Sequence, residues 1–213
     1  MLVDDSALRS FHALELRRRR QVTQQRKAIE AQLRQQQEEQ ATATAALSSL
    51  VTAQSFYQAA TKIAFYLAVD GEIDPRLLLS QALVEGKTCF LPIVNQRDKQ
   101  LLSFAPYDST TELVENQWGI PEPPAPATEI SPTGFDLVLV PLVAFDRECY
   151  RLGMGKGFYD RTFSFKIFNR SSQPLLIGLA HECQLAEGLP NESWDVRLDA
   201  VVTAEKIYRP DTA

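Results

Sequence analysis

From residue 62 onward, short and nearly continuous apolar runs alternate with more polar segments. One of the intervening segments, PRLLLSQALVEG, has the composition of a helix. Apolar strands that alternate with helices are typical of a parallel sheet covered on both faces. The pattern therefore predicts an α/β fold whose core strands come from the apolar runs. These runs are KIAFYLA, KTCFLPIV, FDLVLVPLVAF, PLLIGLA and LDAVVTA.

Residues 12–50 have a different amino-acid composition. They contain four consecutive arginines and the Gln-rich stretch RQQQEEQATATAALSSL, and they hold neither Gly nor Pro. Such a segment predicts a long and largely solvated helix. The prolines concentrate instead in GIPEPPAPATEISPTGFD, which predicts a surface loop over the sheet edge. At 213 residues, the length predicts a single domain over 1–213.

Composition narrows the class of protein. The formal net charge of −5 argues against wholesale nucleic-acid binding. No apolar run approaches the roughly 20 residues of a membrane helix, and the N-terminus lacks a signal pattern. The three cysteines lie far apart without metal-ligand spacing, which suits a reducing compartment. We therefore expect a cytoplasmic monomer with neither a membrane nor a nucleic-acid partner.

The stretch RLGMGKGFYDR, residues 151–161, places three glycines at alternate positions. It follows the apolar run FDLVLVPLVAFD and precedes a predicted helix, FYDRTFSFKIF. Strand, glycine-rich loop and helix in that order form a phosphate cradle in α/β folds, where backbone N–H groups and the positive helix end face the anion. The spacing matches neither the Walker pattern nor the dinucleotide pattern, so a plain tight turn stays open. Arg151 and Lys156 favour phosphate because both can neutralise its oxygens.

Two acidic residues are candidate metal ligands. Asp160 follows the loop at once, and Mg²⁺ binds one or two carboxylates together with phosphate oxygens. The alternative for Asp160 is a helix cap or an ion pair with Arg161. Asp195, in NESWDVRLDAVVT, is a second candidate, and its alternative is a turn residue.

The segment PLVAFDRECYRLGMGKGFYDR resembles the signature region of the 5-formyltetrahydrofolate cyclo-ligase family. IAFYLAVDGEIDP, WGIPEP, HECQL and LPNESWDVRLDAVVT occur in the order that the family shows. The resemblance covers residues 60–208 well and the N-terminal segment only loosely. It implies a three-layer α/β/α sandwich with a mainly parallel sheet and an N-terminal helical extension.

The resemblance also implies an activity. Family members use ATP and Mg²⁺ to convert 5-formyltetrahydrofolate into 5,10-methenyltetrahydrofolate, releasing ADP and phosphate. The formyl oxygen is phosphorylated, N10 attacks the activated carbon, and phosphate leaves. Such chemistry asks the protein mainly for positioning and charge stabilisation.

By resemblance, site residues can be assigned one by one. Arg151 and Lys156 would act on the transferred phosphate, and Asp160 with Asp195 would hold Mg²⁺. The pterin would lie against Leu67, Glu72, Trp118 and Tyr159, with ordinary core packing as the alternative for the aromatic residues. ATP would be bound by Arg17, Arg18, Arg20, Arg151, Leu152, Gly153, Met154, Gly155, Lys156, Gly157, Phe158, Tyr159 and Asp160.

The sequence departs from the family pattern at two places. About a dozen extra residues separate the basic run at Arg17 to Arg20 from IAFYL, so which arginine would reach ATP is open; a nucleic-acid or acidic-partner patch and a solvated helix face are the alternatives. Cys149 stands where the family usually has Gly, so the turn before the loop should adopt positive φ less easily. Two other classes of function also stay open: a nucleotide-binding regulatory module without turnover, and an interaction protein acting through the helix at 12–50.

Overall fold

The computed structural model divides the chain into two compact units, Met1–Thr42 and Ala43–Ala213, and the β-sheet belongs to the second. A helix over 39–52 accounts for the end of the predicted N-terminal helix, whereas residues 12–38, with the basic run at Arg17 to Arg20, lie outside the described residues. The structure describes residues 39–69, 71–94, 98, 100–124, 130–170 and 173–211.

The centre of the fold is a seven-stranded sheet in the order β11-β10-β9-β6-β1-β2-β3. The five predicted apolar runs supply the five parallel strands, so the predicted α/β class is confirmed. Pro141 follows β6 directly and divides the longest run, because a proline cannot donate a ladder hydrogen bond. The parallel strands are β1 (Lys62–Ala64), β2 (Thr88–Val94), β6 (Leu137–Val140), β9 (Leu175–Leu179) and β10 (Ala200–Val202).

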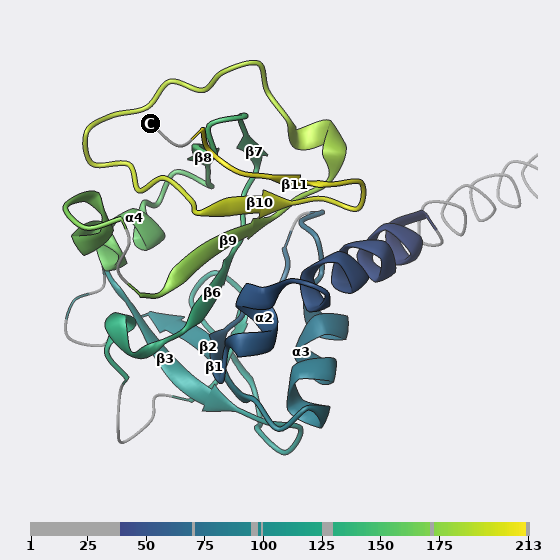
Figure 1. The fold of residues 1–213 in the computed structure, drawn as a ribbon. Helices are drawn as coiled ribbons and strands as arrows, with labels where there is room; N and C mark the ends of the chain where they lie inside the picture. The colour runs from purple at the N-terminus through teal and green to yellow at the C-terminus, as the bar shows by residue number, and fades with distance from the viewer. Residues whose placement is uncertain are drawn as a thin grey trace, which may run out of the picture. The chain divides into compact units, whose positions relative to one another are not determined.

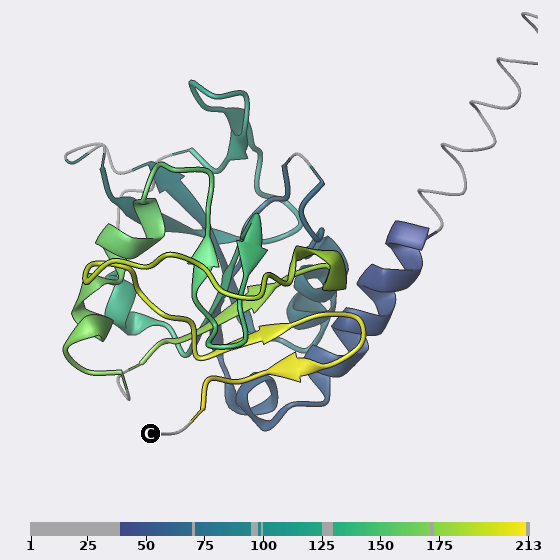
Figure 2. The same ribbon diagram turned by 90° about the horizontal axis from the view of Figure 1, so that it is seen from above.

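The two edge strands of the sheet are antiparallel to their neighbours, and the apolar pattern does not predict them. β3 (Leu102–Tyr107) pairs with β2, and β11 (Ile207–Tyr208) pairs with β10. Figure 2 shows β10 and β11 as the yellow hairpin near the C-terminus. Two small ribbons stand apart from the main sheet, namely β4 (Val114–Glu115) with β5 (Pro121–Glu122) and β7 (Ala144–Phe145) with β8 (Arg151–Leu152).

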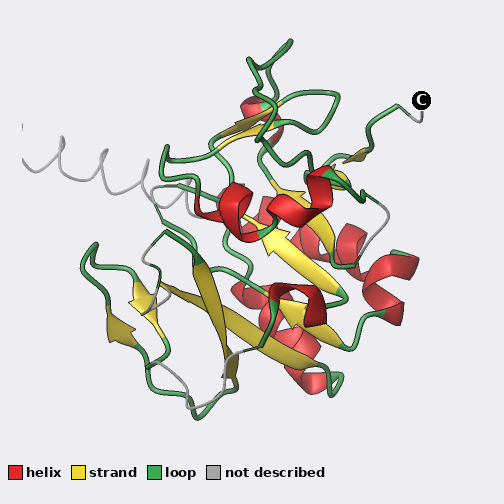
Figure 3. Cartoon of the chain, turned by 90° about the vertical axis from the view of Figure 1, so that its left-hand side faces the viewer, coloured by secondary structure: helices red, strands yellow, loops and turns green. Residues whose placement is uncertain are grey.

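Helical segments cover both faces of the sheet, as the three-layer prediction requires. On one face, residues 47–51 at the end of the first described helix pack on the core with α2 (Ser55–Ala59) and α3 (Arg76–Val84). The other face is covered by α4 (Phe158–Thr162) and the short η2 (Ser164–Ile167). In Figure 1, α4 lies on the opposite side of the sheet from α2 and α3, and in Figure 3 helical segments lie in front of and behind the strands. The remaining 3₁₀ turns are η1 (Pro132–Gly134) and η3 (Glu182–Gln184).

The strand order positions a site. From β1 the chain moves to β2 on one side, whereas β6, which pairs with the other side of β1, is followed by β9 and β10 on that side. The direction of winding therefore reverses between β1 and β6. In open α/β sheets, ligands bind in the crevice outside the carboxyl ends of the strands at such a point. The segments that leave β1 and β6 are therefore the first place to look for a site.

A carboxylate fixes the two strands at this point. Asp136 Oδ2 accepts hydrogen bonds from the Thr61 N–H at 2.8 Å, the Thr61 hydroxyl at 2.8 Å and the Lys62 N–H at 2.9 Å. These bonds join the start of β1 to the start of β6. Within the described part of the chain, the helices are too short or too polar to cross a membrane.

Candidate active site

The segment that leaves β1 carries Glu72 beyond the carboxyl end of that strand. Glu72 is buried, and its Oε2 accepts a hydrogen bond from the Val69 N–H at 3.1 Å. The Glu72 N–H donates in return to the Val69 carbonyl at 3.1 Å, so the two residues close a turn. Tyr66, on the same segment, donates its hydroxyl to the Ile73 carbonyl at 2.6 Å. Leu67 is partly buried against the core on the α3 side.

The Glu72 carboxylate lies near enough to Tyr159, which follows the glycine loop, to affect the pKa of its phenol. Burial, followed by the nearby Glu72 carboxylate, raises the pKa of the Tyr159 phenol, and Arg151 acts in the opposite direction. Burial, then Glu72 and then Tyr159 also raise the pKa of Tyr66. Both phenols therefore stay protonated near neutral pH. The structure thus brings Glu72 and Tyr159, predicted from two distant motifs, into one site.

The glycine loop begins directly after the second strand of the β7–β8 ribbon, at the end of the ribbon that lies next to β6. The Val143 N–H donates to the Leu152 carbonyl at 2.8 Å, and β7 pairs with β8, so the chain leaves β6 through this hairpin before it reaches the loop. Gly155 has φ +79° and Gly157 has φ +63°, a region that strongly favours glycine. A Cβ atom placed on Gly153 or Gly155 would meet nothing within 4 Å. The loop therefore has open space beside its backbone.

The predicted helix after the loop is present but short. α4 has five residues, with Gly157 in the N-cap position, and η2 follows it. A one-turn helix adds little charge at its end, since the macrodipole is a sum over aligned peptides. The predicted contribution of a positive helix end is therefore minor here. What the loop offers an anion is its backbone N–H groups and the exposed Lys156.

Asp160 takes part in a buried network. Its Oδ1 accepts hydrogen bonds from Arg151 Nη2 at 2.9 Å and from the Val196 N–H at 3.1 Å, while Arg151 Nη1 donates to the Val196 carbonyl at 2.6 Å. The Arg151 side chain is only 6% exposed. The alternative of an Asp160 ion pair with Arg161 is wrong, because Arg161 bonds to the carbonyls of Lys156 and Gln100. In this conformation the Arg151 guanidinium is engaged by Asp160 and by the Val196 carbonyl.

Asp195 directly precedes Val196, whose backbone N–H donates to Asp160. Its Oδ2 accepts a hydrogen bond from the Glu192 N–H at 2.8 Å, so it closes a turn as its alternative interpretation requires. Asp160 therefore bonds to the residue next to Asp195, which brings the two segments that carry the predicted metal ligands side by side. Within the described ranges, no group of three or more His, Cys, Asp or Glu residues could hold a metal ion. A cation here would need ligands from a bound molecule as well.

Aromatic rings gather at the exit of the loop. Trp118 lies on the turn between β4 and β5, 41% exposed, and its ring packs edge-on against Phe158 with centroids 5.8 Å apart. The Asn116 side chain holds this turn by accepting the Trp118 N–H at 3.0 Å. Tyr159 stacks on Phe163 at 6.2 Å. Trp118 therefore packs against Phe158, the residue before Tyr159, and the rings of Trp118 and Phe158 form an aromatic wall beside the loop.

Cys149 adopts the conformation that the family's Gly would take. Its φ is +61°, and it is buried. Its N–H donates to the Asp146 carbonyl at 2.9 Å, and its carbonyl accepts the Leu198 N–H at 3.0 Å. The expected difficulty is overcome by these contacts at a cost of about 1–2 kcal/mol. Burial raises the pKa of the Cys149 thiol to about 12, so it is a poor nucleophile at neutral pH.

Sequence reasoning missed His181, at the carboxyl end of β9. Burial lowers the pKa of the His181 imidazole, and a hydrogen bond with the Gly71 backbone acts against that shift. Gln184, in the same turn, donates its Nε2–H to the carbonyls of Leu142 at 2.9 Å and Val143 at 3.0 Å. This turn therefore ties together the segments that leave β1, β6 and β9. The available signal was its place after an apolar run, in HECQL.

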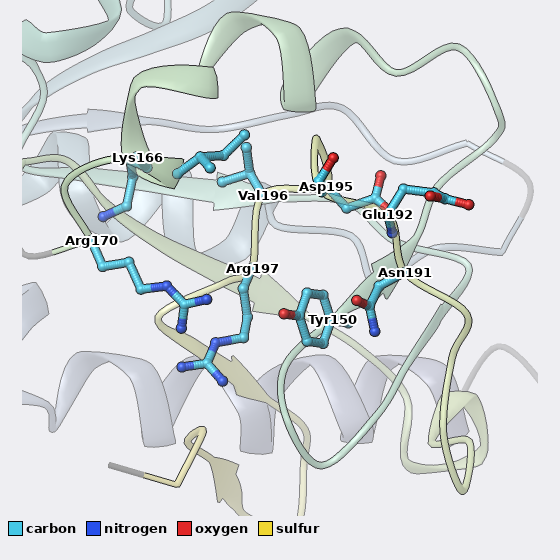
Figure 4. Close-up of a pocket in the computed structure, with 10 residues that line it drawn as sticks. Tyr150, Lys166, Arg170, Asn191, Glu192, Asp195, Val196 and Arg197 are labelled. Atoms are coloured by element: carbon cyan, nitrogen blue, oxygen red, sulfur yellow. The ribbon is translucent and has the colours of Figure 1, made fainter. Parts of the chain in front are cut away.

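A cavity of about 340 Å³ is lined in part by Asp195 and Val196 (Figure 4). In that view Arg170 and Arg197 extend toward one side, and Glu192 and Asp195 lie on the other. Arg197 is already paired with Glu148 at 3.2 Å, so the charges of the cavity are opposed. A phosphate cradle, in contrast, is uniformly positive. The lining residues are Tyr150, Lys166, Ile167, Arg170, Asn191, Glu192, Ser193, Asp195, Val196 and Arg197.

Comparison with known proteins gives one consistent result. A profile described as the 5-formyltetrahydrofolate cyclo-ligase family matches residues 5–204. A 5-formyltetrahydrofolate cyclo-ligase of Escherichia coli is 37% identical over 188 residues, which cover 88% of this chain and 98% of that protein. One of Haemophilus influenzae is 41% identical over 140 residues, covering 65% of this chain and 73% of that protein.

Solved structures agree with these relatives. The chain is similar to a 5,10-methenyltetrahydrofolate synthetase of Aquifex aeolicus, with a TM-score of 0.66 and 30% identity over 80% of this chain and 82% of that one. A 5,10-methenyltetrahydrofolate synthetase of Mycoplasma pneumoniae has the same fold, with a TM-score of 0.58 at 23% identity over 78% of this chain and 87% of that one.

Proposed function

The chain belongs to the 5-formyltetrahydrofolate cyclo-ligase family, and from this premise we propose that it converts 5-formyltetrahydrofolate into 5,10-methenyltetrahydrofolate at the expense of ATP. The formyl oxygen takes the γ-phosphoryl group, and ADP leaves. N10 then attacks the activated carbon, and the bond from that carbon to the phosphorylated oxygen breaks, which releases phosphate. The protein's part is to hold the two substrates in line and to stabilise the charge that moves between them.

The glycine loop suits the phosphates of ATP. Its backbone is exposed, and the spaces beside Gly153 and Gly155 are open, so phosphate oxygens can approach the main-chain N–H groups. Lys156 is exposed within the loop and supplies the positive charge nearest to those groups. We assign the γ-phosphate to this loop, with Lys156 neutralising the charge that develops as it is transferred. The arginines at 17, 18 and 20 stay candidates for further contacts.

The two aspartates suit Mg²⁺ held jointly with phosphate. One oxygen of Asp160 and one of Asp195 are engaged in hydrogen bonds, and within the described ranges the other oxygen of each has no hydrogen-bond partner. Mg²⁺ takes one or two carboxylates and fills its remaining positions with water and phosphate oxygens, so a two-carboxylate site is sufficient. When bound, the ion would neutralise phosphate charge. Arg151 would keep the Asp160 carboxylate oriented toward it.

The folate half of the site is assigned to Glu72, Leu67, Trp118 and Tyr159. A pterin edge carries N–H donors, which a carboxylate can accept, and its flat faces suit aromatic and apolar side chains. The observation that carries the proposal is that β1 and β6 are parallel neighbours, so the segment with Glu72 and the segment with the glycine loop leave the sheet at the same edge. In agreement, burial and the Glu72 carboxylate raise the pKa of the Tyr159 phenol. This arrangement supports a folate site at Glu72 beside an ATP site at the glycine loop, so that the two substrates could meet there.

One assay tests the proposal. The purified chain is mixed with 5-formyltetrahydrofolate and Mg-ATP, and methenyltetrahydrofolate absorbance is followed together with ADP release. We expect both signals to rise in parallel, and neither to rise when ATP or folate is omitted or when the metal is chelated. ATP binding without either product would favour a nucleotide-binding regulatory module instead.

A further inference from the structure

Arg161 lies beneath the glycine loop and contacts three separate parts of the site. Its Nη2 donates to the Lys156 carbonyl at 2.5 Å, and its Nε donates to the Gln100 carbonyl at 2.9 Å, just ahead of β3. Its guanidinium also lies over the Phe158 ring, 5.8 Å from the centroid. The Phe158 ring in turn packs edge-on against Trp118. One side chain therefore links the loop, the start of β3 and the aromatic wall.

The contact with Lys156 orients a peptide group. In a trans peptide the carbonyl and the N–H point in opposite directions. Because Arg161 holds the Lys156 carbonyl, the Gly157 N–H of the same peptide points away from Arg161. The loop's main-chain donor is therefore fixed on the side opposite the guanidinium and cannot turn inward.

The glycine at 157 is part of the same arrangement. A Cβ atom at this position would lie 2.9 Å from Arg161 Nη1, closer than such contacts normally are. The guanidinium thus occupies the space that a side chain would fill. The left-handed φ of +63° is a second reason why this position favours glycine. The planar guanidinium carries its N–H donors in a fixed fork, so one arginine can bond two carbonyls in a set direction while lying over a ring, whereas a lysine ammonium is a point charge on a flexible stem.

We propose that Arg161 is a positioning residue for the phosphate loop, which presents the Gly157 N–H to an anionic ligand by holding the Lys156–Gly157 peptide from behind. The inference rests on the proposed binding of ATP at this loop. Arg161 is exposed, so its removal should cost little folding stability. The loop should instead sample several orientations, and the anion should lose an aligned donor.

The test uses Arg161→Ala and Arg161→Lys, with Arg209→Ala as the matched control. Arg209 is also exposed and donates to one acceptor, Gln54 Oε1 at 3.3 Å, on a different part of the chain. Mg-ATP affinity is measured by calorimetry, KM for ATP and for folate are measured separately, and melting temperature is recorded for each variant.

We expect Arg161→Ala to weaken Mg-ATP binding roughly tenfold, as for the loss of one aligned hydrogen bond to a charged group. The melting temperature and the folate KM should be unchanged, and millimolar guanidinium should restore part of the ATP affinity. The Mg-ATP affinity of Arg161→Lys should fall between that of Arg161→Ala and that of the unmodified chain. Arg209→Ala should match the unmodified chain.

Three results would overturn the inference. If the unmodified chain binds no Mg-ATP, the proposed nucleotide site fails and this role fails with it. If the unmodified chain binds but Arg161→Ala binds equally well, only the positioning role is wrong. If both Arg161 variants have a lower melting temperature and guanidinium does not restore their ATP affinity, the arginine merely supports the fold.

Discussion

Glu72 and Trp118 serve the proposed folate site through different chemistry, so their variants should fail differently. Glu72→Gln replaces an acceptor oxygen with a donor facing the pterin's donors, and we expect a loss of about 1–3 kcal/mol in folate binding. Trp118→Ala removes stacking area and should raise the folate KM with a smaller effect on kcat. Separate KM measurements for folate and ATP check both, and an effect on ATP alone would contradict the assignment.

The three loop glycines differ in what a side chain would do. Gly153 has open space and no left-handed φ, so Gly153→Val should keep the melting temperature while its side chain hinders the phosphates and weakens ATP binding about tenfold. Gly155→Val should also destabilise the protein, by about 1–2 kcal/mol, because φ is +79°. Gly188, equally open but outside the loop, gives the control Gly188→Val. Unchanged nucleotide affinity in Gly153→Val would place the phosphates elsewhere.

At the scale of elements, one buried ion pair attaches η2 to the sheet. Lys166 Nζ donates to Asp199 Oδ2 at 2.9 Å and to the Pro174 carbonyl at 2.8 Å, and Asp199 Oδ2 also accepts the Leu176 N–H at 2.7 Å. The Lys166 side chain is only 2% exposed. Lys166→Met leaves Asp199 without its cation and should lower the free energy of unfolding by about 3 kcal/mol.

Urea unfolding measures this cost, and a double variant provides the control. In Lys166→Met with Asp199→Asn, the buried charge is gone, so part of the stability should return. A double variant no more stable than Lys166→Met would mean that packing of the lysine stem, and not the ion pair, holds η2.

For the whole molecule, the carboxylate that joins the two central strands predicts a loss of stability in acid. Burial alone would raise the pKa of Asp136, but hydrogen bonds from Lys62 and Thr61 outweigh it and lower the pKa below the ordinary 3.8. A carboxyl group with a lowered pKa in the folded state contributes stability above its unfolded pKa. That contribution is lost as pH falls from about 3.8 through the folded value.

Urea midpoints measured from neutral pH downward check the effect. Asp136→Asn should be less stable at neutral pH, and the difference from the unmodified chain should shrink in acid, where Asp136 is protonated too. A constant difference across the whole range would exclude this carboxylate as a source of the acid sensitivity. Asp136 lies near the start of β1 and β6, away from the proposed site, so ligand affinity at neutral pH should be retained.

The sequence by itself determined the central strands and the family. The five apolar runs became the five parallel strands because strands buried on both faces are apolar at nearly every position. The edge strands β3 and β11 were not predictable, since they pair on one side only and their sequences lack a continuous apolar run. The glycine loop and Asp160 were found because glycine spacing and carboxylates leave a local signature.

Only the tertiary structure decided how those residues are used. Asp160 pairs with Arg151 and not with its neighbour Arg161, because Val196, far along the chain, supplies the donor and acceptor that close the network. Glu72 affects the pKa of Tyr159 because β1 and β6 are neighbours in the sheet, which brings the segments that follow them to the same edge. Cys149 takes a left-handed φ because Asp146 and Leu198 hold its backbone. Each of these outcomes depends on a contact between segments that a local pattern cannot contain.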